Sequence, residues 1–138
     1  MSRFGIEPGG RLAGRLSIPG DKSISHRVLL LAALADGVST IRGLSDGDDV
    51  ARTRAILEAL GVELAGSPAE GLEVRGGQFR EPEGPLDVGN SGTGIRLLAG
   101  MLAGLPFVSV LDGDLARRGF SNPPLNAMHA GQYSANFA

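Results

Sequence analysis

One pattern occurs twice along this chain: a glycine-containing polar turn leads into a strongly apolar run. The first copy is Pro19–Arg27 (PGDKSISHR), which precedes the apolar residues 28–35. The second copy is Asp87–Arg96 (DVGNSGTGIR), which precedes the apolar residues 97–103. The copies lie roughly 66 to 69 residues apart, and self-similarity at a fixed spacing indicates a repeated supersecondary unit. The sequence therefore predicts two copies of one unit, of which the second is incomplete.

The first turn has the composition of an anion site at the start of a helix. The leading N–H groups of a helix lack partners within it, and the helix dipole adds partial positive charge there. Lys22 supplies a mobile charge, Ser23 a hydroxyl group and Arg27 a planar guanidinium one turn further on. The spacing also fits a helix capped by Ser23, with two solvated cations and with Asp21 as a turn or capping residue. The first turn alone leaves both interpretations open.

The second turn repeats this arrangement and favours the anion-site interpretation. Asn90 or Ser91 can cap the helix that follows, and Arg96 comes about one turn later. Gly92 lies where a Cβ atom would crowd a ligand against the backbone, and Thr93 completes the turn. Two helix N-termini that each carry a basic side chain predict one site for a ligand with more than one anionic group.

Apolar periodicity and turn residues predict alternating strands and helices, and therefore an α/β fold. We expect helices over residues 23–35, 48–60 and 91–103, and strands over residues 11–18, 38–42, 62–65, 72–74, 86–88 and 107–111. The order β-α-β-α-β-β then occurs once in full and once in part. The first ten residues are expected to form a flexible leader, since four of them are Pro or Gly.

The middle predicted helix has an apolar face and a charged face. Ser45 or Asp46 is its expected N-cap. The nearby acidic residues lack the glycine spacing and the distal glutamate of a calcium-binding loop, so we interpret them as capping residues: Asp46, Asp48 and Asp49. The charged side chains of the outer face are expected to be solvated: Arg52, Arg54 and Glu58.

Composition limits the classes of function. The 138 residues include no cysteine, which excludes disulfides, a thiol nucleophile and a thiolate metal site. The formal net charge of −2 argues against general nucleic-acid binding, and the longest apolar run is too short to span a bilayer. His26 is interpreted as structural, because no partner for a metal site or a catalytic triad accompanies it.

Together the two turns resemble the N-terminal signatures of the 5-enolpyruvylshikimate-3-phosphate synthase family. The matching segments are residues 19–27 and 86–96, and the likeness extends over about residues 11–118. The resemblance implies transfer of the enolpyruvyl group of phosphoenolpyruvate to the 5-hydroxyl of shikimate 3-phosphate, with release of phosphate. It also implies a cytoplasmic protein with no metal, no organic cofactor and no nucleic-acid or membrane partner, and glyphosate as a competitor of phosphoenolpyruvate.

The resemblance assigns roles to individual residues. Lys22 would contact both ligands and act in catalysis, while Ser23 and Arg27 would hold shikimate 3-phosphate. The second turn and a later arginine would hold phosphoenolpyruvate: Asn90, Gly92, Thr93 and Arg118. The segment 115–120 is shorter than its family counterpart, so the register of Arg118 stays open.

The resemblance also implies a domain division and three functional hypotheses. Residues 11–138 would be a truncated N-terminal enolpyruvyl transferase domain, with an atypical tail over 119–138. The chain could be a fragment that binds both ligands but turns over poorly alone. It could be a non-catalytic module that binds phosphoenolpyruvate or glyphosate and confers glyphosate tolerance. It could also be a piece that complements the missing remainder of a split enzyme.

Overall fold

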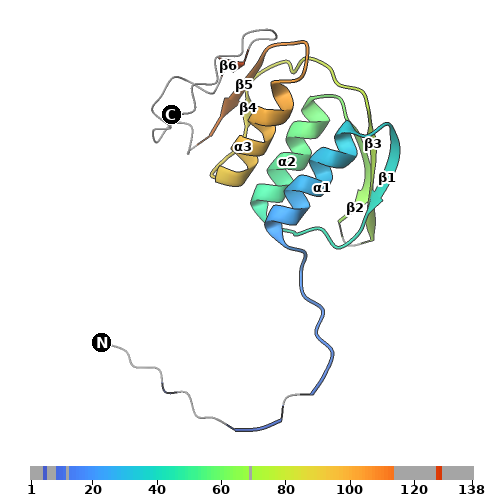
Figure 1. The fold of residues 1–138 in the computed structure, drawn as a ribbon, viewed down its shortest axis with the longest axis vertical. Helices are drawn as coiled ribbons and strands as arrows, with labels where there is room; N and C mark the ends of the chain where they lie inside the picture. The colour runs from blue at the N-terminus through green and yellow to red at the C-terminus, as the bar shows by residue number, and fades with distance from the viewer. Residues whose placement is uncertain (1–4, 6–8, 12, 69, 114–126, 129–138) are drawn as a thin grey trace.

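Three helices lie side by side in the computed structural model of the part of the chain that is described, residues 5, 9–11, 13–68, 70–113 and 127–128 (Figure 1). In chain order the elements are α1 (Lys22–Leu34), β1 (Gly37–Ile41), α2 (Asp48–Ala59), β2 (Glu63–Ser67), β3 (Gly71–Gly76), β4 (Leu86–Asp87), α3 (Gly92–Leu102), β5 (Ser109–Asp112) and β6 (Ala127–Met128). The predicted α/β class is confirmed.

The strands form two small sheets, and both contact α2. The first sheet has the antiparallel order β1-β3-β2 and packs against α1 and α2. Alternation along β3 buries Leu72 and Val74 and exposes Glu73 and Arg75. In the second sheet, β4 pairs in parallel with β5, and β5 pairs antiparallel with β6. A parallel pair needs a crossover connection, which α3 provides.

Polar side chains define where α1 and α3 begin. Asp21 accepts the N–H of Ile24 at 2.8 Å, so the N-cap of α1 is Asp21 and the interpretation of Ser23 as the cap is wrong. Ser91 caps α3 by accepting the N–H of Gly94 at 3.0 Å. Both helices agree with the predicted ranges to within one residue at each end.

Helix α2 begins without a side-chain cap. Its N-cap position is Gly47, whereas the sequence predicted Ser45 or Asp46. Two acidic residues in the first turn, Asp48 and Asp49, instead face the positive end of the helix dipole. The predicted capping role of the acidic cluster is therefore wrong, because Gly47 holds the N-cap position and Asp48 and Asp49 belong to the first turn of α2.

The strand predicted over residues 11–18 is wrong. The structure describes Arg11 and residues 13–18 of this segment, and they form no strand. Leu16 and Ile18 are 92% and 82% exposed. An alternating pattern needs hydrogen-bonding partners to become a strand, and none of the described strands pairs with this segment. Most of the predicted leader, residues 1–10, lies outside the described residues.

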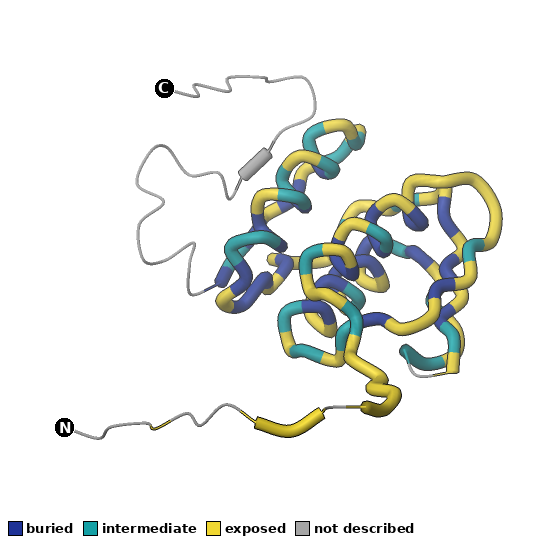
Figure 2. The backbone as a smooth tube through the Cα atoms, turned by 60° about the horizontal axis from the view of Figure 1, so that its bottom comes forward, coloured by how far each residue is buried: buried dark blue, intermediate teal, exposed yellow. Residues whose placement is uncertain are grey.

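One apolar core joins the helices to both sheets. It includes Leu29 of α1, Leu57 of α2, Leu98 of α3 and Leu111 of β5, all buried. Figure 2 shows buried positions alternating with exposed ones along the helices, and an exposed segment before α1. Because this core packs α1, α2 and α3 against one another, it also fixes the separation between their ends.

Candidate functional site

The N-termini of α1, α2 and α3 meet at one end of the molecule, because the three helices run in the same direction (Figure 1). This helix-start end carries both predicted turns, residues 19–23 at the start of α1 and residues 87–91 before α3. Unpartnered N–H groups and partial positive charge from three helices therefore gather there. The helix-start end is the candidate site.

Lys22 lies in the first turn of α1 and forms an ion pair with α2. Its Nζ is 2.8 Å from Oδ2 of Asp49. The side chain of Lys22 is 53% exposed, and that of Asp49 is 24% exposed. Lys22 is thus accessible to a ligand, but its charge is already shared with a carboxylate. Sequence reasoning missed this role of Asp49, because the two residues lie on different helices.

The other two predicted residues of the first turn stay close to Lys22. Nη1 of Arg27 donates to the backbone carbonyl of Ser23 at 2.9 Å. Arg27 is exposed and Ser23 is half-buried. The guanidinium therefore folds back along the first turn of α1 toward its N-terminus. The structure brings Lys22, Ser23 and Arg27 together at the start of one helix, as the sequence predicts.

The second turn is held by two side-chain acceptors. Oδ1 of Asp87 accepts the N–H of Gly89 at 2.8 Å, and Ser91 caps α3. Asn90 is exposed, while Gly92 and Thr93 are half-buried in the first turn of α3. All three predicted residues of this turn therefore lie at the helix-start end. Arg118, the other residue predicted for the same ligand, lies outside the described residues.

His26 connects the three helix starts from inside the molecule. It is fully buried, and its Nδ1 is 2.8 Å from Oγ1 of Thr53 on α2. A Cβ atom added to Gly94 of α3 would lie 3.7 Å from Cε1 of His26. Burial lowers the pKa of His26; Asp49 opposes this effect, while Lys22 adds to it. These contacts agree with the structural role predicted for His26.

The outer face of α2 is not simply solvated. Arg52 forms an ion pair with Asp87 of β4, and the Nε atom of the half-buried Arg54 is buried without a hydrogen-bond partner. Arg52 and Glu58 are exposed as predicted, although Arg52 also pairs with Asp87, and the prediction of a solvated side chain is wrong for Arg54. The local pattern could not reveal these contacts, since they depend on how α2 packs.

Asp49, Arg52 and Thr53 share one face of α2 at the spacing i, i+3 and i+4. Each contacts a different part of the helix-start end: Lys22, Asp87 and His26 respectively. Sequence reasoning missed all three as contributors to the site. The available signal was their common helical face.

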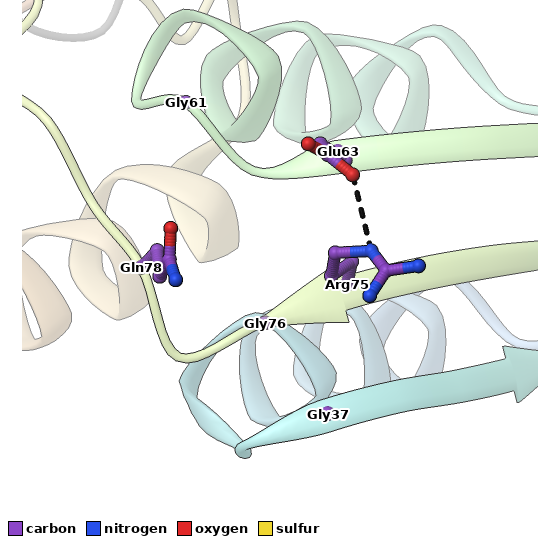
Figure 3. Close-up of a pocket in the computed structure, with 6 residues that line it drawn as sticks. All are labelled: Gly37, Gly61, Glu63, Arg75, Gly76 and Gln78. Atoms are coloured by element: carbon purple, nitrogen blue, oxygen red, sulfur yellow. Dashed lines mark ion pairs between the residues drawn. The ribbon is translucent and has the colours of Figure 1, made fainter.

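A small pocket lies at the opposite end of α1 and α2. It is lined by Gly37, Gly61, Glu63, Arg75, Gly76 and Gln78 (Figure 3). Arg75 is the basic side chain of this pocket, and its Nε is 3.1 Å from Oε2 of Glu63. Helix C-termini carry partial negative charge, so this end disfavours anions. The pocket therefore does not compete with the helix-start end as an anion site.

Two features are absent from the part of the chain that the structure describes, a metal-ligand cluster and a membrane-spanning helix. This part contains no group of three or more His, Cys, Asp or Glu side chains that could hold a metal ion. None of its helices combines the length and the apolar character needed to cross a bilayer.

Solved structures of EPSP synthase share this fold. Two structures of EPSP synthase from Acinetobacter baumannii match this chain with TM-scores of 0.75 and 0.76, at 30% and 29% sequence identity. Each match covers 86% of this chain and 32% of the other. The architecture described above is thus part of the EPSP synthase fold.

The sequence identifies the family. Residues 6–119 match the family model of EPSP synthase (3-phosphoshikimate 1-carboxyvinyltransferase), and the chain belongs to this family. It is 49% identical over 137 residues to the 3-phosphoshikimate 1-carboxyvinyltransferase of Acidithiobacillus ferrooxidans and 47% identical over 134 residues to that of Alkalilimnicola ehrlichii. These matches cover 94% and 92% of this chain, which spans about a third of the relatives' length, 32% and 30%.

Proposed function

We propose that this chain binds shikimate 3-phosphate and phosphoenolpyruvate at the helix-start end. The observation that carries the proposal is the meeting of two glycine-containing turns and three helix N-termini at one end of a member of the EPSP synthase family. Phosphate and carboxylate groups bind well at such positions, because free N–H groups and the helix dipole both favour negative charge.

The two turns divide the ligands between them in this proposal. The first turn, with Lys22, Ser23 and Arg27, holds shikimate 3-phosphate. The second turn, with Asn90 and the start of α3, holds phosphoenolpyruvate, for which glyphosate competes. Lys22, which reaches from the first turn to Asp49 of α2, contacts both ligands in this proposal. Because both ligands are phosphorylated metabolites, we place the protein in the cytoplasm.

Enolpyruvyl transfer joins the 5-hydroxyl oxygen to phosphoenolpyruvate, passes through a tetrahedral ketal and then releases phosphate. Lys22 is the residue that we propose to act in catalysis, by neutralising charge on the phosphate as it leaves. The step also needs a group that moves protons. Among the described residues near the site, His26 is buried with a lowered pKa and an oriented Nδ1, which does not suit that role. We therefore propose binding without turnover for this chain alone.

Titration of the purified chain tests this function. Shikimate 3-phosphate is added first and phosphoenolpyruvate second, while backbone amide shifts and heats of binding are followed. We expect saturable binding of both ligands, the largest shifts at the starts of α1 and α3, and displacement of phosphoenolpyruvate by glyphosate. Inorganic sulfate at the same ionic strength is the control. No saturable binding, or equal shifts with sulfate, would refute the proposal.

An exposed apolar stripe on α1 supports a second function, as a piece that complements the remainder of the enzyme. Ile24, Leu31 and Leu34 are 62%, 65% and 48% exposed. Their spacing places them along one side of the helix. Because the relatives are about three times as long as this chain, the occupant that we propose for the stripe is the rest of the family fold.

A further inference from the structure

We propose that Arg52 of α2 is a positioning residue for the second turn. Arg52 binds the carboxylate of Asp87, and Asp87 in turn fixes the backbone N–H of Gly89. The inference rests on the proposed function, because it concerns the turn to which that function assigns phosphoenolpyruvate. It gives Arg52 a role in setting the affinity for this ligand without touching it.

A continuous set of contacts leads from α2 to the backbone of the turn. Nη1 of Arg52 donates to Oδ2 of Asp87 and forms an ion pair with it. The other carboxylate oxygen, Oδ1, accepts the N–H of Gly89 at 2.8 Å. Both oxygens of one carboxylate are thus used, one toward the helix and one toward the turn. Loss of Arg52 would free the carboxylate from α2 and leave its bond to Gly89 without that support.

The side chain of Arg52 also lies directly against the turn. Gly89 has a φ of +57°, in the left-handed region that favours glycine. A Cβ atom added there would lie 2.6 Å from Cδ and 2.8 Å from Cζ of Arg52. Any other residue at this position would push the guanidinium away. Glycine at position 89 is therefore required for two reasons: the turn needs a positive φ there, and the side chain of Arg52 occupies the space of a Cβ atom.

The next strand holds the same turn from a second element. The N–H of Val88 donates to the carbonyl of Asp112 in β5 at 2.7 Å. A Cβ atom added to Gly113 would lie 2.9 Å from the backbone nitrogen of Gly89. The turn is therefore fixed by β5 through its backbone and by α2 through Arg52. The contacts from β5 involve the backbone and survive a substitution, whereas the contact from α2 is lost when the side chain of Arg52 is replaced.

The value of the Arg52–Asp87 pair lies in geometry more than in stability. The two side chains are 44% and 65% exposed, and exposed ion pairs contribute little to the free energy of unfolding. An anion bound by backbone N–H groups depends on their direction, so a turn fixed beforehand binds more tightly. A planar, permanently charged guanidinium suits this task better than a flexible ammonium group.

Substitution of Arg52 tests the inference against a matched control. Arg75 is also an exposed arginine in an ion pair, with Glu63, but it lies at the opposite end of the molecule. We expect Arg52→Ala to weaken phosphoenolpyruvate binding to the chain saturated with shikimate 3-phosphate by about tenfold. The affinity for shikimate 3-phosphate alone should change less than about twofold, and Arg75→Ala should change neither. Equal losses for both ligands, or the same losses in Arg75→Ala, would overturn the inference.

A second measurement needs no ligand. Hydrogen exchange of the Gly89 amide should be faster in Arg52→Ala than in the wild type or Arg75→Ala, and partly restored in Arg52→Lys. Adding Arg52→Ala to Asp87→Ala should cause little further loss of phosphoenolpyruvate affinity, because without Asp87 the guanidinium has no carboxylate to position. Unchanged exchange at Gly89 would overturn the role of Arg52. Absence of ligand binding by the wild type would instead refute the proposed function.

Discussion

Under the proposed function, Lys22 meets an incoming anion while already paired with Asp49. The pair is accessible to solvent, so its own contribution to stability is small and a ligand can share or replace the carboxylate. We predict that Lys22→Ala weakens binding of both shikimate 3-phosphate and phosphoenolpyruvate by about tenfold or more, the effect of losing a charge-assisted contact. Calorimetric titration of each ligand measures this loss.

The control for Lys22→Ala must be a cation that does not touch the site. Arg52 was expected to be such a residue from the sequence, but its bond to Asp87 disqualifies it. Arg75 meets the requirement, since it pairs with Glu63 at the opposite end of the helices. A similar loss of affinity in Arg75→Ala would mean that binding is a general attraction to positive charge.

His26 makes the free energy of unfolding of the chain depend on pH. Burial lowers its pKa below the value of about 6.5 that an exposed histidine has in the unfolded chain. Above pH 6.5 the imidazole of His26 is neutral in both the folded and the unfolded chain, so its burial costs no proton and the stability of the folded chain is at its full value. As the pH falls below 6.5, the unfolded chain binds the proton first, and stability is lost progressively through the lowered pKa of the folded state.

We therefore predict that the free energy of unfolding falls between pH 7.5 and pH 5, and falls less in His26→Asn. Urea denaturation at a series of pH values measures both slopes. The comparison depends on the slope, so a uniformly less stable variant still gives an answer. The same slope in the two proteins would show that other groups control this range of pH.

At the level of residues, the sequence could group site residues that lie close together along the chain, but not those whose partners lie on other elements. Lys22, Ser23 and Arg27 could be grouped from the sequence because they lie within about two turns of one helix. Asp49 and Arg52 could not, because their partners belong to α1 and β4. A charged residue on a helix is most often solvated without a fixed partner, and only the packing of α2 shows that these two form ion pairs.

At the level of elements, the second turn depends on the cap of α3. Ser91 is 2% exposed, and its hydroxyl oxygen accepts the N–H of Gly94. Ser91→Ala would leave this donor buried without a partner. We predict a loss of about 1 kcal/mol in the free energy of unfolding, together with weaker phosphoenolpyruvate binding. Chemical denaturation and ligand titration measure the two effects.

Asp46→Ala is the matched control for Ser91→Ala. The sequence made Asp46 a candidate cap of α2, but the N-cap position is Gly47 and Asp46 is exposed. Its substitution should change the free energy of unfolding by no more than about 0.5 kcal/mol. If the two variants lost the same stability, the cap at Ser91 would not be the cause.

Helices were easier to predict than strands, for a physical reason. A helix forms its hydrogen bonds within one segment, so capping residues and apolar spacing located α1 and α3 closely. A strand completes its hydrogen bonds only with a partner. The segment over residues 11–18 has the alternation of a strand, but its described residues have no partner strand and Leu16 is exposed.

At the scale of the whole molecule, the described residues gather the groups of the proposed binding site at one end and present an exposed apolar stripe along α1. Positive charge and free N–H groups at the helix-start end can bind anions without further protein. Catalysis also requires groups that move protons within a site closed to water. We predict that the chain alone releases no measurable phosphate from phosphoenolpyruvate and shikimate 3-phosphate, even at high protein concentration. Turnover that disappears in Lys22→Ala would contradict this prediction.

Mixing the chain with the rest of a full-length relative tests whether the phosphate release that the chain lacks alone can be restored. A separately produced segment that carries the rest of a full-length relative should bind the α1 stripe and restore phosphate release. Leu31→Glu should prevent this, because a charge at the centre of the stripe would have to be buried. Leu31 is 65% exposed in the chain alone, so the variant should still fold and bind shikimate 3-phosphate.

If Leu31→Glu bound shikimate 3-phosphate and were complemented as well as the wild type, the stripe would not be the contact surface. Restored turnover that survived Lys22→Ala would likewise exclude the helix-start end as the catalytic site.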